Sequence, residues 1–151
     1  MKKKNSLDQV QAYRLAEFRR PSFAAAEIIH ATGLPEKTLQ NYLARYEDAM
    51  QLSAPAPGKG QRRMYSAADA VYLAAVRAIA NFGVAPSAAI LLANHVRAWV
   101  MTEARWRYEC GFTGLPAQYF GFGPKTDGNG VDLMVQGAGP EIQSWAAEHG
   151  H

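Results

Sequence analysis

A connection of three residues, Gly-Leu-Pro at positions 33–35, constrains the fold of this chain more than any other feature of its sequence. An alanine-rich helix is expected over residues 23–31, capped by Ser22 and closed by the glycine. The proline is favoured in a first helical turn, so a second helix is expected over residues 35–50. Two helices joined through a glycine in so few residues indicate a helix-turn-helix.

The helix expected over residues 35–50 has two unlike faces. Apolar side chains recur at helical spacing along one side, at Leu39, Leu43, Tyr46 and Met50. The opposite side carries polar side chains at four-residue intervals, Lys37, Asn41 and Arg45, with Thr38 and Gln40 beside them. Amides pair bidentately with adenine, and cationic groups suit guanine or phosphate oxygens. A solvated helix face is the alternative, but the neighbouring segments favour a face that contacts DNA.

The segment after this helix lacks apolar periodicity. Residues 53–60 are Ser, Ala, Pro, Gly and Lys, and residues 61–65 are Gln-Arg-Arg-Met-Tyr. This composition predicts a turn or hairpin with a basic tip, whose cations are Lys59, Arg62 and Arg63. Beside a helix in the major groove, such a loop places arginines on the phosphate backbone or in the minor groove. A flexible linker with incidental charge is the alternative.

Three more helices are expected, over residues 6–19, 66–82 and 87–110. Ser66 and Asp69 resemble a capping box at the start of the second of these, and Gly83 ends it. The third presents a stripe that is suited to a short helix pair between two chains, made of Leu92, Val96, Trp99, Glu103 and Trp106.

The last forty residues are rich in glycine and aromatic residues. Eight glycines lie between Gly111 and Gly139, a short strand is expected over residues 131–136, and a final helical turn or two over residues 140–148. A cap over the helices or a dimer surface is favoured here, with a small ligand pocket or a partner surface as alternatives.

Composition and charge narrow the class of protein. Cys110 is the only cysteine, so an intrachain disulfide and a thiolate metal cluster are excluded, and a cytoplasmic location is expected. Polar residues interrupt the apolar stretch 84–101, and no apolar segment follows the N-terminal lysines, so neither a membrane span nor a signal peptide is expected.

Residues 1–65 carry eleven Lys or Arg against six Asp or Glu, a net +5, while residues 66–151 carry a net −2. This asymmetry suggests that a polyanion meets the first part of the chain.

Four stretches in order resemble the DNA-binding domain of MerR-type regulators. They are the segment 23–34, which ends in Ala-Thr-Gly-Leu, Thr-Leu-Gln-Asn-Tyr at 38–42, Arg-Met-Tyr-Ser at 63–66, and the helix that ends in Asn-Phe-Gly at 81–83. The resemblance covers residues 23 to about 92, under half of the chain, and implies a winged helix-turn-helix over 22–92. With the segments on either side, a mainly α fold is expected: a basic N-terminal arm or helix over residues 1–21, this domain, and a helix with a dimerisation or effector region over 93–151.

The same resemblance implies roles for individual residues. Lys37, Gln40 and Asn41 would contact DNA, Tyr42 would reach a phosphate, and Arg63 would hold the backbone from the wing, while Thr38 and Tyr65 also occupy matched positions. For the two tyrosines, core packing with a hydrogen-bonded hydroxyl is an equal alternative. Pro35, Gln40 and Asn41 depart from the family pattern, so no DNA sequence preference is carried over.

These observations predict a DNA-binding transcriptional regulator. Its expected partners are double-stranded DNA and a second copy of the chain, with RNA polymerase or a small effector as further candidates, and no membrane. An architectural protein of phage or plasmid type, such as an excisionase or a small terminase subunit, is one alternative, and a protein-interaction adaptor is another. The histidines His30, His95, His149 and His151 are not spaced for catalysis or metal binding, so no enzyme activity, cofactor or metal is expected.

Overall fold

The computed structural model describes residues 2–110, 118–124, 131–138, 144 and 147. The chain divides into two compact units, Met1–Cys110 and Gly111–His151. The described part is mainly helical, as the sequence predicts, and it contains five helices and two small two-stranded sheets. None of the helices in these ranges is long and apolar enough to cross a membrane.

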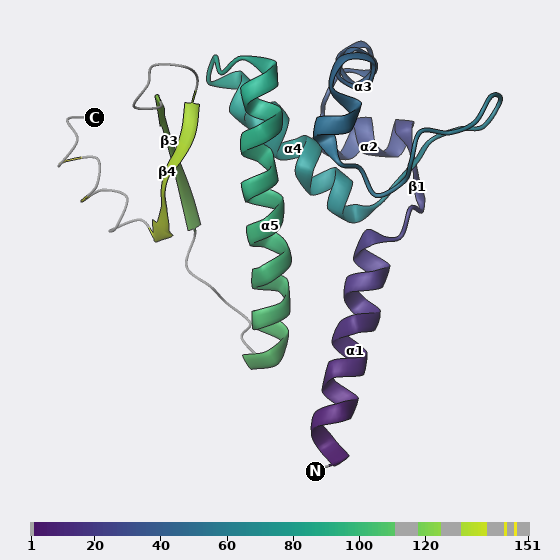
Figure 1. Ribbon diagram of the computed structural model, residues 1–151, viewed down its shortest axis with the longest axis vertical. Coiled ribbons are helices and arrows are strands. Elements are labelled where there is room, and N and C mark those ends of the chain that lie inside the picture. The colour runs from purple at the N-terminus through teal and green to yellow at the C-terminus, as the bar shows by residue number, and fades with distance from the viewer. Residues whose placement is uncertain (1, 111–117, 125–130, 139–143, 145–146, 148–151) are drawn as a thin grey trace. The chain divides into compact units, whose positions relative to one another are not determined.

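The first unit contains all five helices. Its elements in chain order are α1 (Lys2–Arg19), β1 (Phe23–Ala24), α2 (Ala25–Thr32), α3 (Glu36–Met50), β2 (Met64–Tyr65), α4 (Ala67–Asn81) and α5 (Pro86–Cys110). Helix α4 contacts α1, α2 and α5, and α5 also contacts α3 and α1. Figure 1 shows α5 alongside α4, and a long loop between α3 and β2 that extends away from the helices.

The connection between α2 and α3 forms the tight turn that the sequence predicts. Gly33 has a φ of 65°, and its N–H donates to the carbonyl of Ile29 at 2.8 Å, so the glycine ends α2. The hydroxyl of Thr32 donates to the carbonyl of Ile28 at 2.7 Å and accepts from the N–H of Leu34 at 3.2 Å. Leu34 is buried in the turn.

The predicted start of α2 is wrong by two residues. Phe23 and Ala24 form β1, which pairs antiparallel with β2, and Ser22 donates its N–H to the carbonyl of Tyr65 at 2.9 Å. Ser22 is therefore not the N-cap, and the N–H of Ala24 donates instead to the Glu27 carboxylate at 2.7 Å. The strand that pairs with β1 lies about forty residues further along the chain, so local capping signals do not reveal this pairing.

The capping box that opens α4 is confirmed. The N–H of Asp69 donates to the Ser66 hydroxyl at 3.1 Å, and the N–H of Ser66 donates to the Asp69 carboxylate at 2.8 Å. Both residues are fully buried. The core of the unit lies around α4, and its buried apolar side chains include Ile28, Leu39, Met50, Tyr65, Tyr72, Leu73, Val76, Ile90 and Leu92.

Helix α5 contributes to this core. Leu92 is buried within the unit, so the first position of the predicted intermolecular stripe is not available to another chain. Val96 and Trp99 are half-buried, while the side chains of Glu103 and Trp106 lie outside the described set. The helix also runs without interruption through the domain boundary expected after residue 92.

The second unit contains an antiparallel pair, β3 (Gln118–Pro124) and β4 (Val131–Ala138). The strand predicted at residues 131–136 is confirmed and extends two residues further. Its partner β3 was not predicted, because the glycines at 121 and 123 obscure the period-two pattern of a strand. Of the helix predicted at 140–148, Ser144 and Ala147 are helical, and the other residues lie outside the described ranges.

Candidate nucleic-acid interface

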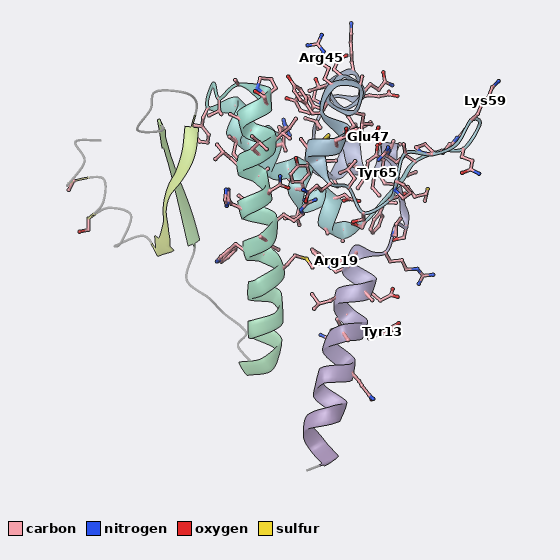
Figure 2. All side chains as sticks on the ribbon, in the orientation of Figure 1. Tyr13, Arg19, Arg45, Glu47, Lys59 and Tyr65 are labelled. Atoms are coloured by element: carbon pink, nitrogen blue, oxygen red, sulfur yellow. The ribbon has the colours of Figure 1, made fainter. Side chains whose placement is uncertain are left out.

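Helix α3 separates its polar and apolar side chains as expected. Lys37, Asn41 and Arg45 are all exposed, at successive turns of one face. Leu39 and Met50 are buried on the other side, while Leu43 and Tyr46 are half-buried. Figure 2 shows Arg45 directed away from the rest of the unit. The side chains proposed for base and phosphate contacts are therefore accessible along the helix.

The exposed face of α3 is also balanced in charge. Glu36 and Asp48 are exposed on the same helix and offset Lys37 and Arg45. The amide nitrogen of Gln40 donates to the Glu36 carboxylate at 3.2 Å, so one of its donors is already used. Thr38 is half-buried at the edge of this face. The helix therefore offers specific donors and acceptors rather than a net positive field.

The loop over residues 53–63 supplies the uncompensated positive charge. It contains no acidic residue, and Lys59 and Arg62 are exposed. Gly60 has a φ of 80°, and the N–H of Gln61 donates to the carbonyl of Gly58 at 3.0 Å, which closes the turn at the tip. Figure 2 shows Lys59 at the far end of this loop. The predicted basic tip is confirmed for these two cations.

Arg63 differs from its sequence-based assignment. Its side chain is only 10% exposed and forms an ion pair with Glu47 of α3. The same guanidinium donates to the carbonyl of Ala54 at 3.2 Å. These contacts tie the returning arm of the loop to α3 and to the outgoing arm. Arg63 therefore holds the loop in place, which corrects its prediction as a free backbone contact.

A polar cluster that includes the buried Ser66 and Asp69 closes the base of the same loop. The Ser53 hydroxyl lies 2.7 Å from the Ser66 hydroxyl and donates to the Asp69 carboxylate at 3.1 Å. The N–H of Ser53 donates to the same carboxylate oxygen at 3.0 Å. Because Ser53 begins the loop and Ser66 follows its end, Asp69 joins both arms to the start of α4.

The two matched tyrosines are core residues. Tyr65 is 2% exposed, and burial raises the pKa of its phenol, with Asp69 and Glu47 adding to the rise and Arg63 opposing it. Tyr42 is 8% exposed, and its ring meets that of Tyr46 edge to face, with 6.4 Å between centroids. Tyr65 cannot present its side chain to a duplex, and Tyr42 has little surface for one. Both tyrosines are therefore packed in the core, which was the alternative to a DNA contact in the sequence analysis.

Two arginines that the sequence analysis did not single out bind the C-terminal ends of α2 and α3. Arg77 of α4 donates to the carbonyl of Thr32 at 2.8 Å, at the end of α2. Arg97 of α5 donates to the carbonyls of Met50 and Gln51 at 3.2 and 3.0 Å, at the end of α3. Cations are favourable at helix C-termini.

Arg97 is packed against other side chains of the core. It lies over the ring of Tyr72, 4.5 Å from the centroid, and burial lowers the pKa of its guanidinium. The sequence signal for both residues is a single arginine inside an otherwise apolar helical pattern, at positions 77 and 97. This signal does not indicate which carbonyl the side chain contacts.

Other site chemistry is not apparent in this part of the chain. Among the residues that the structure describes, no group of three or more His, Cys, Asp or Glu could hold a metal ion. His30 and His95 are exposed on different helices. Neither a protein-family model nor a curated protein sequence matches this chain.

Proposed function

We propose that this chain binds double-stranded DNA through a winged helix-turn-helix over residues 22–92, and that it acts as a transcriptional regulator. Helix α3 is the recognition helix and the loop over residues 53–63 is the wing. The observation that carries the proposal is the row of Lys37, Asn41 and Arg45, exposed on a helix whose other side is buried in the unit. The resemblance to MerR-type regulators supports the same assignment.

The distribution of charge suggests a division of work within this interface. The wing cations Lys59 and Arg62 have no acidic neighbour in their loop, so they provide the attraction to phosphates. The charge-balanced face of α3 contributes little net attraction and instead offers Asn41 and Lys37 to base edges. Two protomers binding a symmetric site would place two such helices in successive major grooves.

The first test is a gel shift with genomic fragments, competed with unrelated DNA and repeated at two salt concentrations. A regulator gives specific shifts that weaken as salt increases. Equal affinity for every fragment would favour the architectural protein. Absence of binding at low salt would refute DNA binding and favour the adaptor.

Variants separate the two parts of the interface. Asn41→Ala should cost about 1 to 3 kcal/mol on the preferred sequence and little on unrelated DNA, because a base contact is lost. Arg62→Ala should weaken binding to all duplexes and reduce the salt slope by about one. Arg14→Ala makes the same change of charge on α1 and serves as the control. Equal effects of Arg62→Ala and Arg14→Ala would contradict the proposed wing.

A further inference from the structure

A cavity of about 620 Å³ lies where α1, α3, α4 and α5 meet. Arg19 of α1 lines one part of it, and Arg97 and Asn94 of α5 line another. Gln51 and Ser53, which follow α3, complete its polar surface. This volume is within the range of small-molecule sites, which combine a concave shape with a few convergent polar groups. None of these residues belongs to the proposed DNA-contacting set.

The two arginines at this cavity have unused donors. Arg97 spends three of its five N–H groups, on the carbonyls of Met50 and Gln51 and on the Asn94 side chain at 2.6 Å. The Arg19 side chain is exposed, and its guanidinium makes no hydrogen bond or ion pair with the residues whose side chains the structure describes. Both can therefore donate to a molecule inside the cavity.

The side chains that line the cavity carry positive charge. None of the described residues that line it is acidic. Burial is the largest cause of the lowered pKa of Arg97, and the charge of Arg19 adds to it in the same direction. The buried carboxylate of Asp69 acts on Arg97 in the opposite direction and partly offsets this positive charge. An anion between the guanidinium groups would relieve their repulsion and use their remaining donors.

We propose that this cavity binds a small anion bearing carboxylate or phosphate groups, held between Arg19 and Arg97. Gln51, Ser53 and Asn94 supply further polar contacts around it. Because Arg97 also holds the C-terminal end of α3, the bound anion stabilises the folded unit through the same side chain. Ser53 is also the first residue of the wing loop, but none of the lining residues is a proposed DNA contact, and occupancy of the cavity can be measured without DNA.

The test uses isothermal titration calorimetry of the full chain with inorganic phosphate and with citrate, at constant ionic strength. Saturable binding of at least one probe is expected. Tighter binding of phosphate assigns a phosphate ligand, tighter binding of citrate assigns a carboxylate ligand, and either result supports the proposal. No saturable binding of either probe would overturn it.

Arg19→Gln and Arg20→Gln form a matched pair of variants. Arg20 is the next residue, its exposed side chain pairs with Glu17, and it does not line the cavity. Arg19→Gln should weaken binding of the preferred probe about tenfold, the loss of one charge-assisted contact, while Arg20→Gln changes it less than twofold. Both variants should keep the wild-type urea midpoint, since both side chains are exposed. Equal loss in the two variants would contradict the site.

The same pair of variants distinguishes a small anion from the phosphates of DNA. Fluorescence anisotropy with an unrelated duplex should give the same affinity for Arg19→Gln and Arg20→Gln. If Arg19→Gln alone weakens duplex binding and neither probe binds the wild type, the cavity is part of the DNA interface and the small-anion proposal is wrong.

Discussion

Two features of the structure require glycine at position 33. Its φ of 65° suits glycine, and a Cβ at this position would overlap the guanidinium of Arg77. Gly33→Ala should therefore cost about 2 to 3 kcal/mol, from backbone strain and from the displaced bond between Arg77 and the Thr32 carbonyl. Urea unfolding followed by circular dichroism measures this cost.

Gly60 provides the control for that substitution. It has a φ of 80°, and an added Cβ would have no neighbour within 4 Å. Gly60→Ala should cost only the strain of the backbone, about 1 kcal/mol. Equal losses at the two glycines would mean that Arg77 does not matter at the end of α2.

Tyr72 gives the stability of the unit a dependence on alkaline pH. Its hydroxyl donates to the carbonyl of Ile90 at 2.9 Å, and burial raises the pKa of the phenol despite the opposing charge of Arg97. Below the ordinary value of 10.0 the phenol is neutral in both states, so its contribution is fully present. Above that value the unfolded chain releases a proton that the folded chain retains, and stability falls as pH rises.

The effect of Tyr72→Phe on the free energy of unfolding should change with pH. At pH 8 the variant should be about 1 kcal/mol less stable than the wild type, because it lacks the hydrogen bond to Ile90. Above pH 10 the difference should shrink by up to about 1.4 kcal/mol per pH unit, since phenylalanine does not ionise. Urea unfolding at pH 8, 10 and 11 measures both regimes, with Tyr13→Phe at an exposed ring as control. A constant difference across this range would contradict the assignment.

At the scale of elements, Asp69 organises the wing as well as α4. Its buried carboxylate accepts hydrogen bonds from Ser53 and Ser66, at the two ends of the loop. Asp69→Asn should cost about 2 to 3 kcal/mol, because an amide nitrogen would face a donor in a buried site. Thermal and urea unfolding should both report the loss. The exposed Asp48→Asn should stay within about 0.5 kcal/mol, and a similar cost in both would refute the role of Asp69.

Elements marked by local signals were predictable from the sequence. Gly33 ends α2, and the Ser66–Asp69 capping box opens α4. Both could be predicted because the residues that form each signal are close together in the sequence. The pairing of β1 with β2 was not predicted, since it joins segments forty residues apart. The candidate interface divides in the same way. Helical periodicity identified the exposed Lys37, Asn41 and Arg45, whereas the pairing of Arg63 with Glu47 depends on how the loop returns to α3.

At the scale of the whole chain, the first unit has a hydrophobic core of its own. The buried apolar side chains that the structure describes all lie between Ile28 and Ala93, within the first unit. The same unit contains the contacts that anchor α3, through Arg97, and the wing, through Arg63 and Asp69. The first unit therefore has the core and the polar contacts of an independently folding domain.

A chain that ends at Cys110 should consequently retain a cooperative unfolding transition. Its free energy of unfolding in urea should differ from that of the full chain by no more than about 1 kcal/mol, because none of the described core residues is removed. Circular dichroism follows the helices, and the fluorescence of Trp99 and Trp106, which the shorter chain retains, follows the packing of α5. Coincident transitions by the two probes would indicate one cooperative unit. Loss of the cooperative transition would show instead that residues 111–151 are required for the first unit to fold, and that the helical core does not suffice.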